Sequence, residues 1–141
     1  MSRLILKINR MYPDAMLPTR KHKDDAGLDL PVYGNHRFPD DFTIVVPTGL
    51  KLEIPEGYYG RIIPRSSTLL NRNIIVQEGI VDAGYRGHVG VVIHTVKPVT
   101  LENGESIAQL IICPLTETII EETQTLTESE RGENGFGSTG K

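Results

Sequence analysis

Apolar and polar residues alternate along much of this chain, and the clearest case is residues 50–54. Leu50, Leu52 and Ile54 are separated by Lys51 and Glu53, which predicts a strand with one buried face and one face in water. The same alternation, or a run of β-branched residues, predicts further strands over residues 3–8, 42–46, 58–63, 74–76, 89–96, 98–101 and 107–115.

Helical periodicity is almost absent from the sequence. Residues 66–72 are the one candidate helix, about two turns long, with Ser66 or Ser67 available as its N-cap. Residues 11–25 are expected to form a loop, residues 27–32 are half strand and half turn, and Pro-Thr-Gly at 47–49 is expected to end a strand. Strands recurring about every 8 to 12 residues predict an all-β barrel or sandwich of one domain.

Residues 79–90 read G-I-V-D-A-G-Y-R-G-H-V-G, and the rest of the chain is interpreted around them. Two apolar runs flank a glycine-rich turn, which predicts a hairpin in which Gly84 and Gly87 supply positive φ angles. The turn presents Asp82 beside the ring of Tyr85, a combination that suits water activation next to a sugar or base. An Asp that caps its own backbone is the alternative at this point.

The bulk composition describes an ordinary globular protein. The chain has 141 residues, of which 38% are hydrophobic and 23% are charged. A chain of this length can bury a hydrophobic core without disulfide bonds or bound metals to stabilise it. No apolar run approaches the roughly 18 to 20 residues that span a bilayer, so no membrane partner is expected. Residues 1–10 carry no signal-peptide pattern, which predicts an intracellular protein, cytoplasmic or nuclear, or in a host cell if viral.

Charge and cysteine content exclude several classes of function. A net charge of −3 argues against a general nucleic-acid binder, and the basic run Arg20–Lys23 is followed at once by Asp24 and Asp25. Cys113 is the only cysteine, in an apolar stretch where a buried thiol is expected. A disulfide framework and a cysteine zinc site are therefore excluded.

The composition changes after Thr116. Glutamates then alternate with Thr and Ser, and the chain ends in R-G-E-N-G-F-G-S-T-G-K, which is too rich in glycine for a core. We predict a barrel domain over residues 1–124 and a flexible arm over residues 125–141. The arm carries Arg131, Ser138, Thr139 and glycine amides, groups that wrap a phosphate chain, together with the lone aromatic Phe136.

Other polar residues stand where strands are interrupted. Asp29 lies in A-G-L-D-L, Arg65, Ser66 and Ser67 lie in P-R-S-S at the start of the predicted helix, and Gln109 lies in an otherwise apolar strand, where its amide needs partners. Together with Asp82 and the arm they supply two carboxylates, two arginines, hydroxyls and a glycine-rich flap. This inventory suits a magnesium-bound polyphosphate attacked by water.

Five motifs in order make the chain resemble the homotrimeric dUTP pyrophosphatases (dUTPases) over nearly its whole length. They are A-G-L-D-L (26–30), P-R-S-S (64–67), G-I-V-D-A-G-Y-R-G (79–87), G-E-S-I-A-Q-L-I (104–111) and R-G-E-N-G-F-G-S-T-G (131–140). The resemblance implies a β-jelly roll with one short helix, a trimer with shared active sites, and Mg²⁺-dependent hydrolysis of dUTP to dUMP and pyrophosphate. Such an activity limits uracil in DNA and supplies dUMP for thymidylate synthesis.

The same resemblance implies roles for individual residues. Asp82 would be the general base for the water that attacks the α-phosphorus, and Asp29 would hold Mg²⁺ through water. Tyr85 would exclude a 2′-hydroxyl, backbone groups between Val76 and Gly79 would recognise uracil, and the arm would close with Phe136 stacked on the base. The implied substrate-binding set is Arg65, Ser66, Ser67, Val76, Gly79, Tyr85, Gln109, Arg131, Phe136, Gly137, Ser138 and Thr139.

Four positions depart from the family's usual residues. Ser67 and Asn134 stand where glycine is common, and Asn134 tolerates the left-handed conformation better than most residues. Gln77 and Glu78 precede Gly79 where small residues are common, and a carboxylate there would repel a triphosphate.

Two other functions are compatible with the same fold. A dCTP deaminase needs a glutamate ten residues beyond the hairpin Asp, where this chain has Val92, so that activity is disfavoured. A dUTPase-like module that binds a regulatory partner is the second alternative, although Asp82 and the arm are both retained. A generic β-sandwich binding domain explains the strands but not five ordered polar motifs.

Overall fold

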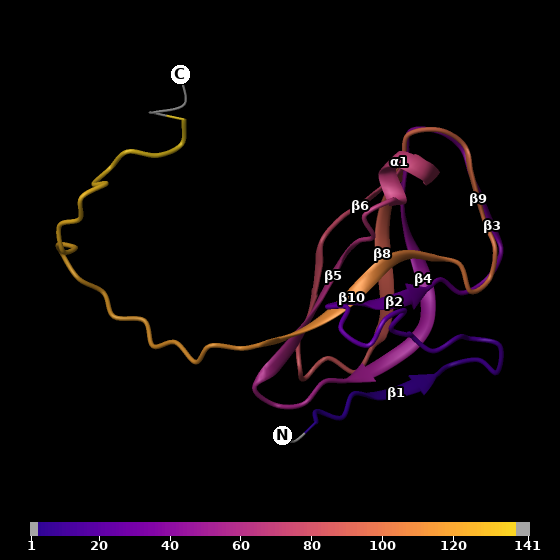
Figure 1. The fold of residues 1–141 in the computed structure, drawn as a ribbon, viewed down its shortest axis with the longest axis horizontal. Helices are drawn as coiled ribbons and strands as arrows, with labels where there is room; N and C mark the ends of the chain where they lie inside the picture. Colours follow the sequence, from indigo (N-terminus) through magenta and orange to yellow (C-terminus); the bar gives the residue numbers. More distant parts are fainter. Residues whose placement is uncertain (1–2, 138–141) are drawn as a thin grey trace.

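The computed structural model describes residues 3–137, and two four-stranded antiparallel sheets form its body (Figure 1). The first sheet has the strand order β1-β4-β8-β6 and the second has the order β2-β10-β5-β7, while β3 and β9 form a separate two-stranded ribbon. The strands span Lys7–Arg10 (β1), Leu28–Pro31 (β2), His36–Phe38 (β3), Phe42–Glu53 (β4), Tyr58–Pro64 (β5), Ile74–Val76 (β6), Gly79–Val81 (β7), His88–Thr95 (β8), Val99–Leu101 (β9) and Ser106–Pro114 (β10). This architecture confirms the predicted all-β jelly roll.

The core lies between the two sheets because inward positions alternate with outward ones. In β8, Val89, Val91 and Ile93 are buried while the residues between them are only half-buried. Leu110 in β10 and Ile62 in β5 face them from the second sheet and are buried too. Burial of side chains on one face only is what the period-two alternation predicts.

Strand β4 does not end at Pro47-Thr48-Gly49, which corrects the predicted break. The pairing with β8 shifts between Pro47 and Lys51, so the extra residues form an irregularity inside one strand. Thr48 stabilises it: the hydroxyl donates to the Val89 carbonyl over 2.6 Å and accepts from the Leu50 amide over 3.2 Å. Gly49 adopts the positive φ of 71° that the irregularity requires.

Residues 79–90 do not form a hairpin, which corrects a second prediction. Strand β7 pairs with β5 in one sheet, whereas β8 pairs with β4 and β6 in the other. The turn between them therefore carries the chain from sheet to sheet, and neither Gly84 nor Gly87 is among the described glycines with positive φ. A local pattern of two strands and a turn does not specify which partners the strands choose.

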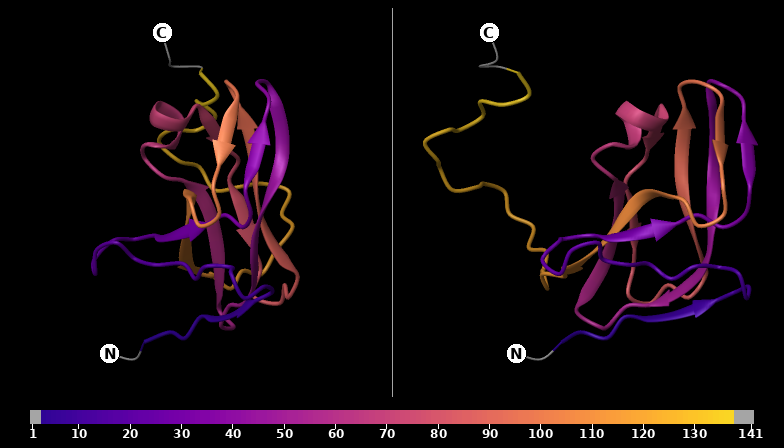
Figure 2. Two further views of the ribbon diagram at one scale, coloured as in Figure 1. Left: turned by 90° about the vertical axis from the view of Figure 1, so that its right-hand side faces the viewer. Right: turned by 45° about the vertical axis from the view of Figure 1, so that its right-hand side comes forward.

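The single helix in the described residues, α1 (Thr68–Arg72), is shorter than predicted. Ser67 occupies the N-cap position, but its side chain makes no capping hydrogen bond. Thr68 anchors the helix instead, because its buried hydroxyl donates to the Ile107 carbonyl over 2.7 Å. Helix α1 lies at the end of the body remote from the N-terminus, as all the views agree (Figures 1 and 2).

The last strand ends at Pro114, and residues 115–137 carry neither helix nor strand. They lead away from the sheets toward the C-terminus (Figure 1). The division between a barrel over 1–124 and an arm over 125–141 stays a prediction. In the part of the chain that the structure describes, no helix is long and apolar enough to cross a membrane.

Candidate functional site

Three of the predicted site residues meet where β2, β10 and the end of β5 lie side by side; we call Asp29, Arg65 and Gln109 the Asp29 cluster. Gln109 lies directly opposite Asp29 in the antiparallel pair β10–β2. The Arg65 Nε lies 3.2 Å from Asp29 Oδ1, and Arg65 also donates to the Ser106 carbonyl over 3.0 Å. Residues far apart in sequence therefore form one polar cluster with both charges paired.

Gln109 is half-buried rather than buried, and its amide nitrogen makes one hydrogen bond to the backbone. Its Nε2 donates to the Pro64 carbonyl over 3.0 Å, while its Oε1 lies over Gly27, where an added Cβ would come within 2.1 Å of it. A side chain at position 27 would therefore displace the Gln109 amide from this position. The A-G-L-D-L motif supplies that space as well as the carboxylate of Asp29.

Ser66 and Ser67 connect the Asp29 cluster to α1. Ser66 is exposed and Ser67 is half-buried, and no hydrogen bond from either hydroxyl is present within residues 3–137. Their backbones are fixed, because the Thr68 amide donates to the Arg65 carbonyl over 3.1 Å and the Asn71 amide donates to the Ser67 carbonyl over 2.8 Å. Both hydroxyls are consequently available to a ligand beside Arg65.

A second group of site residues lies in the turn between β7 and β8; we call residues 82–86 the Asp82 turn. The Tyr85 amide donates to the Asp82 carbonyl over 3.1 Å, and the Tyr85 hydroxyl donates to the His88 carbonyl over 2.9 Å. The Asp82 side chain is exposed and makes no hydrogen bond or ion pair with the described residues. The Asp82 carboxylate therefore does not cap its own backbone.

A cavity of about 570 Å³ opens beside Asp82. Its walls come from the start of β5, from β7, from the Asp82 turn, and from the end of β10 with the two residues after it: Tyr58, Tyr59, Ile80, Asp82, Ala83, Pro114, Leu115 and Thr116. Sequence reasoning did not assign Tyr58, Tyr59 or Ile80 to a site. The adjacent tyrosines were the one available clue, since two aromatic rings together are typical of ligand pockets.

Val76 and Gly79 lie at a point where the chain changes sheets. Val76 ends β6 opposite Ile93 of the first sheet, and Gly79 begins β7 opposite Ile62 of the second. Gln77 and Glu78, which we call the crossing segment, join them. The Glu78 carboxylate accepts from Arg61 of β5, and this interaction raises the pKa of the Arg61 guanidinium above its usual value.

The described part of the arm leads away from the sheets that hold both groups (Figure 1). Arg131 donates to the Asn134 carbonyl over 2.5 Å, and Phe136 is fully exposed with a positive φ of 48°. Gly132 and Gly137 have positive φ, whereas Asn134 does not, so the tolerance of Asn134 for that conformation is not used in this structure. Ser138 and Thr139 lie outside the described residues.

The Asp29 cluster and the Asp82 turn lie at opposite ends of strand β5. Asp82 follows Val81, which pairs with Gly60 near the start of β5, whereas Arg65 follows its last residue, Pro64. Because a strand rises about 3.3 Å per residue, roughly 20 Å separates the two ends. One chain in this conformation cannot present both groups to one small ligand.

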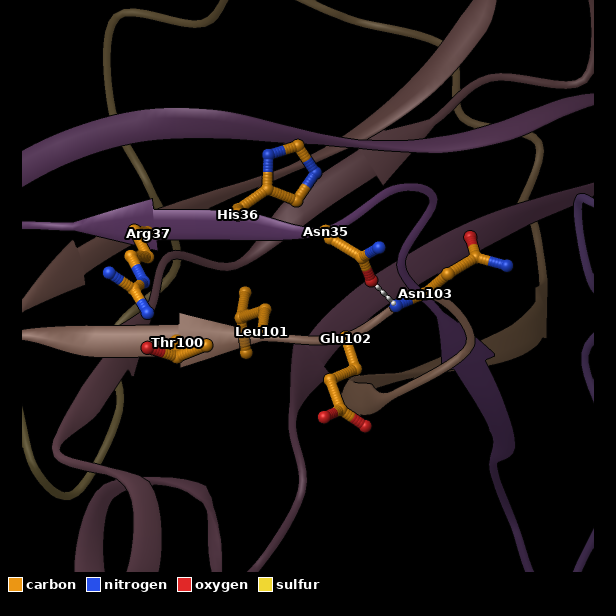
Figure 3. Close-up of a pocket in the computed structure, with 7 residues that line it drawn as sticks. All are labelled: Asn35, His36, Arg37, Thr100, Leu101, Glu102 and Asn103. Carbon is orange, nitrogen blue, oxygen red and sulfur yellow. Dashed lines mark hydrogen bonds between the residues drawn. The ribbon is translucent and has the colours of Figure 1, made fainter.

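Another cavity, of about 510 Å³, lies on the β3–β9 ribbon (Figure 3). Its polar side chains include Asn35, Arg37 and Glu102, and the Asn103 amide donates to Asn35 Oδ1 over 2.9 Å. It contains none of the residues that the motifs predict, so it is not part of the candidate site.

The described residues contain no group of three or more His, Cys, Asp and Glu side chains that could hold a metal ion directly. Asp29 offers a single half-exposed carboxylate, with one oxygen directed at Arg65. That donor set fits a metal that keeps most of its water ligands and is held by one carboxylate and a polyphosphate, as Mg²⁺ commonly is.

Comparison with known sequences assigns the whole chain to one group. A family model described as dUTPase matches residues 14–140. The deoxyuridine 5'-triphosphate nucleotidohydrolase of Clostridium tetani (strain Massachusetts / E88) is 40% identical over an alignment 152 positions long, which covers 100% of both chains. The protein of that name from Oryza sativa subsp. japonica is 39% identical over 138 residues, covering 96% of this chain and 81% of the relative.

Solved structures give the same result. A variant of the Staphylococcus bacteriophage 80alpha dUTPase, solved with dUpNHpp, has a TM-score of 0.89 at 27% identity and covers 96% of this chain and 98% of its own. A dUTPase variant from phage phi11 of S. aureus, solved to describe a structural Mg(II) ion, has a TM-score of 0.82 over 86% of this chain and 97% of its own. Its 23% identity shows a shared fold only.

Proposed function

The chain belongs to the dUTPase family, and from that premise we propose that it hydrolyses dUTP to dUMP and pyrophosphate. The observation that carries the proposal is the match of the family model to residues 14–140, a range that includes all five polar motifs. In this reaction water attacks the α-phosphorus, and the bond from that phosphorus to the bridging oxygen of pyrophosphate breaks. The water loses a proton as its oxygen joins the phosphorus.

Asp82 is the general base in this proposal. Its carboxylate is exposed, carries no partner among the described side chains and borders a cavity, so it is free to accept a proton from a bound water. General-base assistance of this kind contributes about 10²–10⁴-fold to the rate. Tyr85, held by its hydrogen bond to the His88 carbonyl, packs against the deoxyribose and leaves no room for a 2′-hydroxyl.

The Asp29 cluster binds the phosphate chain. Arg65 supplies positive charge, and the free hydroxyls of Ser66 and Ser67 and the Gln109 amide donate hydrogen bonds. Charge-assisted hydrogen bonds from an arginine to phosphate oxygens are among the stronger ones in proteins. On substrate binding, the Arg65 guanidinium exchanges part of its contact with Asp29 for the phosphate.

Magnesium would be held by Asp29 through water and by the phosphate oxygens. When bound, the ion neutralises negative charge on the phosphate chain and on the departing pyrophosphate. Asp29 would then face two cations, Arg65 and the hydrated ion.

The base is recognised by the crossing point of the two sheets and by the arm. Backbone groups of Val76 and Gly79 form hydrogen bonds with the uracil edge, and Phe136 stacks on the ring, a contact worth roughly 1–3 kcal/mol. Arg131, Gly137, Ser138 and Thr139 bind the outer phosphates when the arm closes. Phe136 is fully exposed in the single chain, as a side chain that packs only on a ligand would be.

We also propose a homotrimer whose active sites combine residues of different subunits. Two observations support it: the roughly 20 Å between the Asp29 cluster and the Asp82 turn, and the exposure of Ile119 (91%), Ile120 (93%) and Leu126 (86%) near the start of the arm. Large apolar side chains so exposed in one chain are typical of surfaces that an assembly covers. We place the enzyme in the cytoplasm or nucleus, as predicted.

Hydrolysis assays with dUTP, UTP, dCTP and dTTP test the function. Purified protein should release pyrophosphate from dUTP far faster than from the other three, and EDTA should abolish the release. Equal rates with all four nucleotides, or no release from dUTP, would contradict the proposal.

A further inference from the structure

The side chains of Arg61 and Glu78 form an ion pair beside the base-recognition residues. Arg61 Nε and Nη2 both approach Glu78 Oε1, at 2.8 and 2.7 Å. The Glu78 hydrogen bond is the main cause of the raised pKa of the Arg61 guanidinium. With 38% of the Arg61 side chain and 51% of the Glu78 side chain exposed, the pair adds little to stability.

The position of the ion pair, rather than its contribution to stability, indicates its function. Glu78 belongs to the crossing segment, whose Gln77 amide still donates to Val92 of the first sheet over 2.9 Å. Arg61 lies in β5 of the second sheet, opposite Ile80. The ion pair therefore links the crossing segment to β5 just before Gly79, where the chain passes from the first sheet to the second.

We propose that Arg61 is a positioning residue for base selection, which holds the Glu78 carboxylate away from the nucleobase. The proposal rests on the proposed function, in which backbone groups of Val76 and Gly79, on either side of the crossing segment, bind the uracil edge. Glu78 is the one acidic residue between positions 74 and 81. In the structure its carboxylate is directed to Arg61 of β5.

The chemistry of the base explains why this carboxylate must be held. Uracil, like thymine, presents the O4 oxygen as an acceptor, whereas cytosine presents an N4 amino group as a donor. An ionised carboxylate only accepts hydrogen bonds, so it repels O4 and attracts the cytosine amino group. Its negative charge also opposes the approach of a triphosphate. Release of Glu78 from Arg61 therefore weakens dUTP binding and favours dCTP.

Four variants test the proposal: Arg61→Met, Glu78→Ala, the double variant Arg61→Met/Glu78→Ala, and Lys7→Met as a matched control. Lys7 forms a comparable exposed ion pair with Glu53, 3.5 Å apart, on the first sheet. Steady-state kinetics with dUTP and dCTP, with pyrophosphate as the readout, give kcat and KM separately, and thermal melting confirms that each variant is folded.

Arg61→Met should raise the KM for dUTP about tenfold with kcat little changed, and it should reduce the preference for dUTP over dCTP by a similar factor. The double variant should recover most of the lost affinity, because the carboxylate that Arg61 controls is gone. Lys7→Met and Glu78→Ala should not show the tenfold rise in KM.

Normal kinetics of Arg61→Met would overturn the proposal, and so would a double variant as impaired as Arg61→Met, since Arg61 would then act without Glu78. A fall in kcat with unchanged KM would also overturn it. Failure of the proposed function is separate and is recognised in the unaltered protein, which would release no pyrophosphate from dUTP.

Discussion

Arg65 and Asp82 stand at opposite ends of strand β5, about 20 Å apart. Each belongs to a group of residues that the motifs assign to one reaction. Their separation within one chain therefore favours an active site that combines residues of different subunits. If the proposed homotrimer brings Arg65 of one subunit to Asp82 of another, the two functions can be removed from different chains and still meet in one site.

Subunit mixing tests this arrangement. Arg65→Ala and Asp82→Asn proteins should each be nearly inactive, but co-refolding them in equal amounts should restore activity in about a quarter of the sites, those that receive both intact residues. Pyrophosphate release from dUTP, measured before and after co-refolding, gives the recovery. Mixtures that are trimeric by light scattering yet no more active than their components would show that both residues act within one chain.

Asp82→Asn is the direct test of the base. Asparagine keeps the shape of the side chain but cannot accept the proton, so kcat should fall about 10²–10⁴-fold while dUTP still binds. Calorimetric titration with a non-hydrolysable dUTP analogue checks the binding, and Asp24→Asn in the exposed loop is a matched control. Unchanged turnover in Asp82→Asn would remove this residue from the role of base.

The sequence predicted most strands of the body because their buried positions alternate with outward ones, but the first strand, predicted over residues 3–8, lies at Lys7–Arg10 and has no buried residue. Where it was wrong, a distant residue decided the outcome. Pro47-Thr48-Gly49 contains strong strand breakers, but the Thr48 hydroxyl forms hydrogen bonds with the Val89 carbonyl and the Leu50 amide, and β4 continues through them. The short strand β3 was missed because only three residues pair with β9.

The candidate site was predictable in its residue types but not in its layout. The motifs identify Asp29, Arg65 and Gln109, and these do lie together, yet nothing local distinguishes a hairpin at residues 79–90 from a passage between sheets. That distinction depends on pairing of β7 with β5, which carries Asp82 to the far end of the sheet. The Arg61–Glu78 pair joins residues 17 positions apart in sequence and has no local pattern.

The arm is expected to be dispensable for folding and required for turnover. Residues 131–137 are exposed or half-exposed in the described chain, so truncation after Glu130 should leave the melting temperature nearly unchanged. Loss of base stacking by Phe136 alone should lower kcat/KM about ten- to a hundredfold. Phe136→Trp in the full chain, which keeps a stacking surface, is the matched control. A truncated protein with normal kinetics would show that the arm takes no part in the reaction.

Gly27→Ala tests the coupling between the first and fourth motifs. The added methyl group would lie 2.1 Å from Gln109 Oε1 and 3.0 Å from its Cδ, so the amide must move and its hydrogen bond to the Pro64 carbonyl is strained. A net loss of about 0.5–1.5 kcal/mol in stability is expected, together with a several-fold rise in the KM for dUTP. If Gly27 acts only by making room for that side chain, Gly27→Ala/Gln109→Gly should be no more impaired than Gln109→Gly, since glycine at 109 also removes the Cβ that would lie 3.1 Å from the added methyl group. Chemical denaturation and steady-state kinetics on the three variants measure both effects, and strictly additive losses in KM would show that Gly27 serves the site in another way.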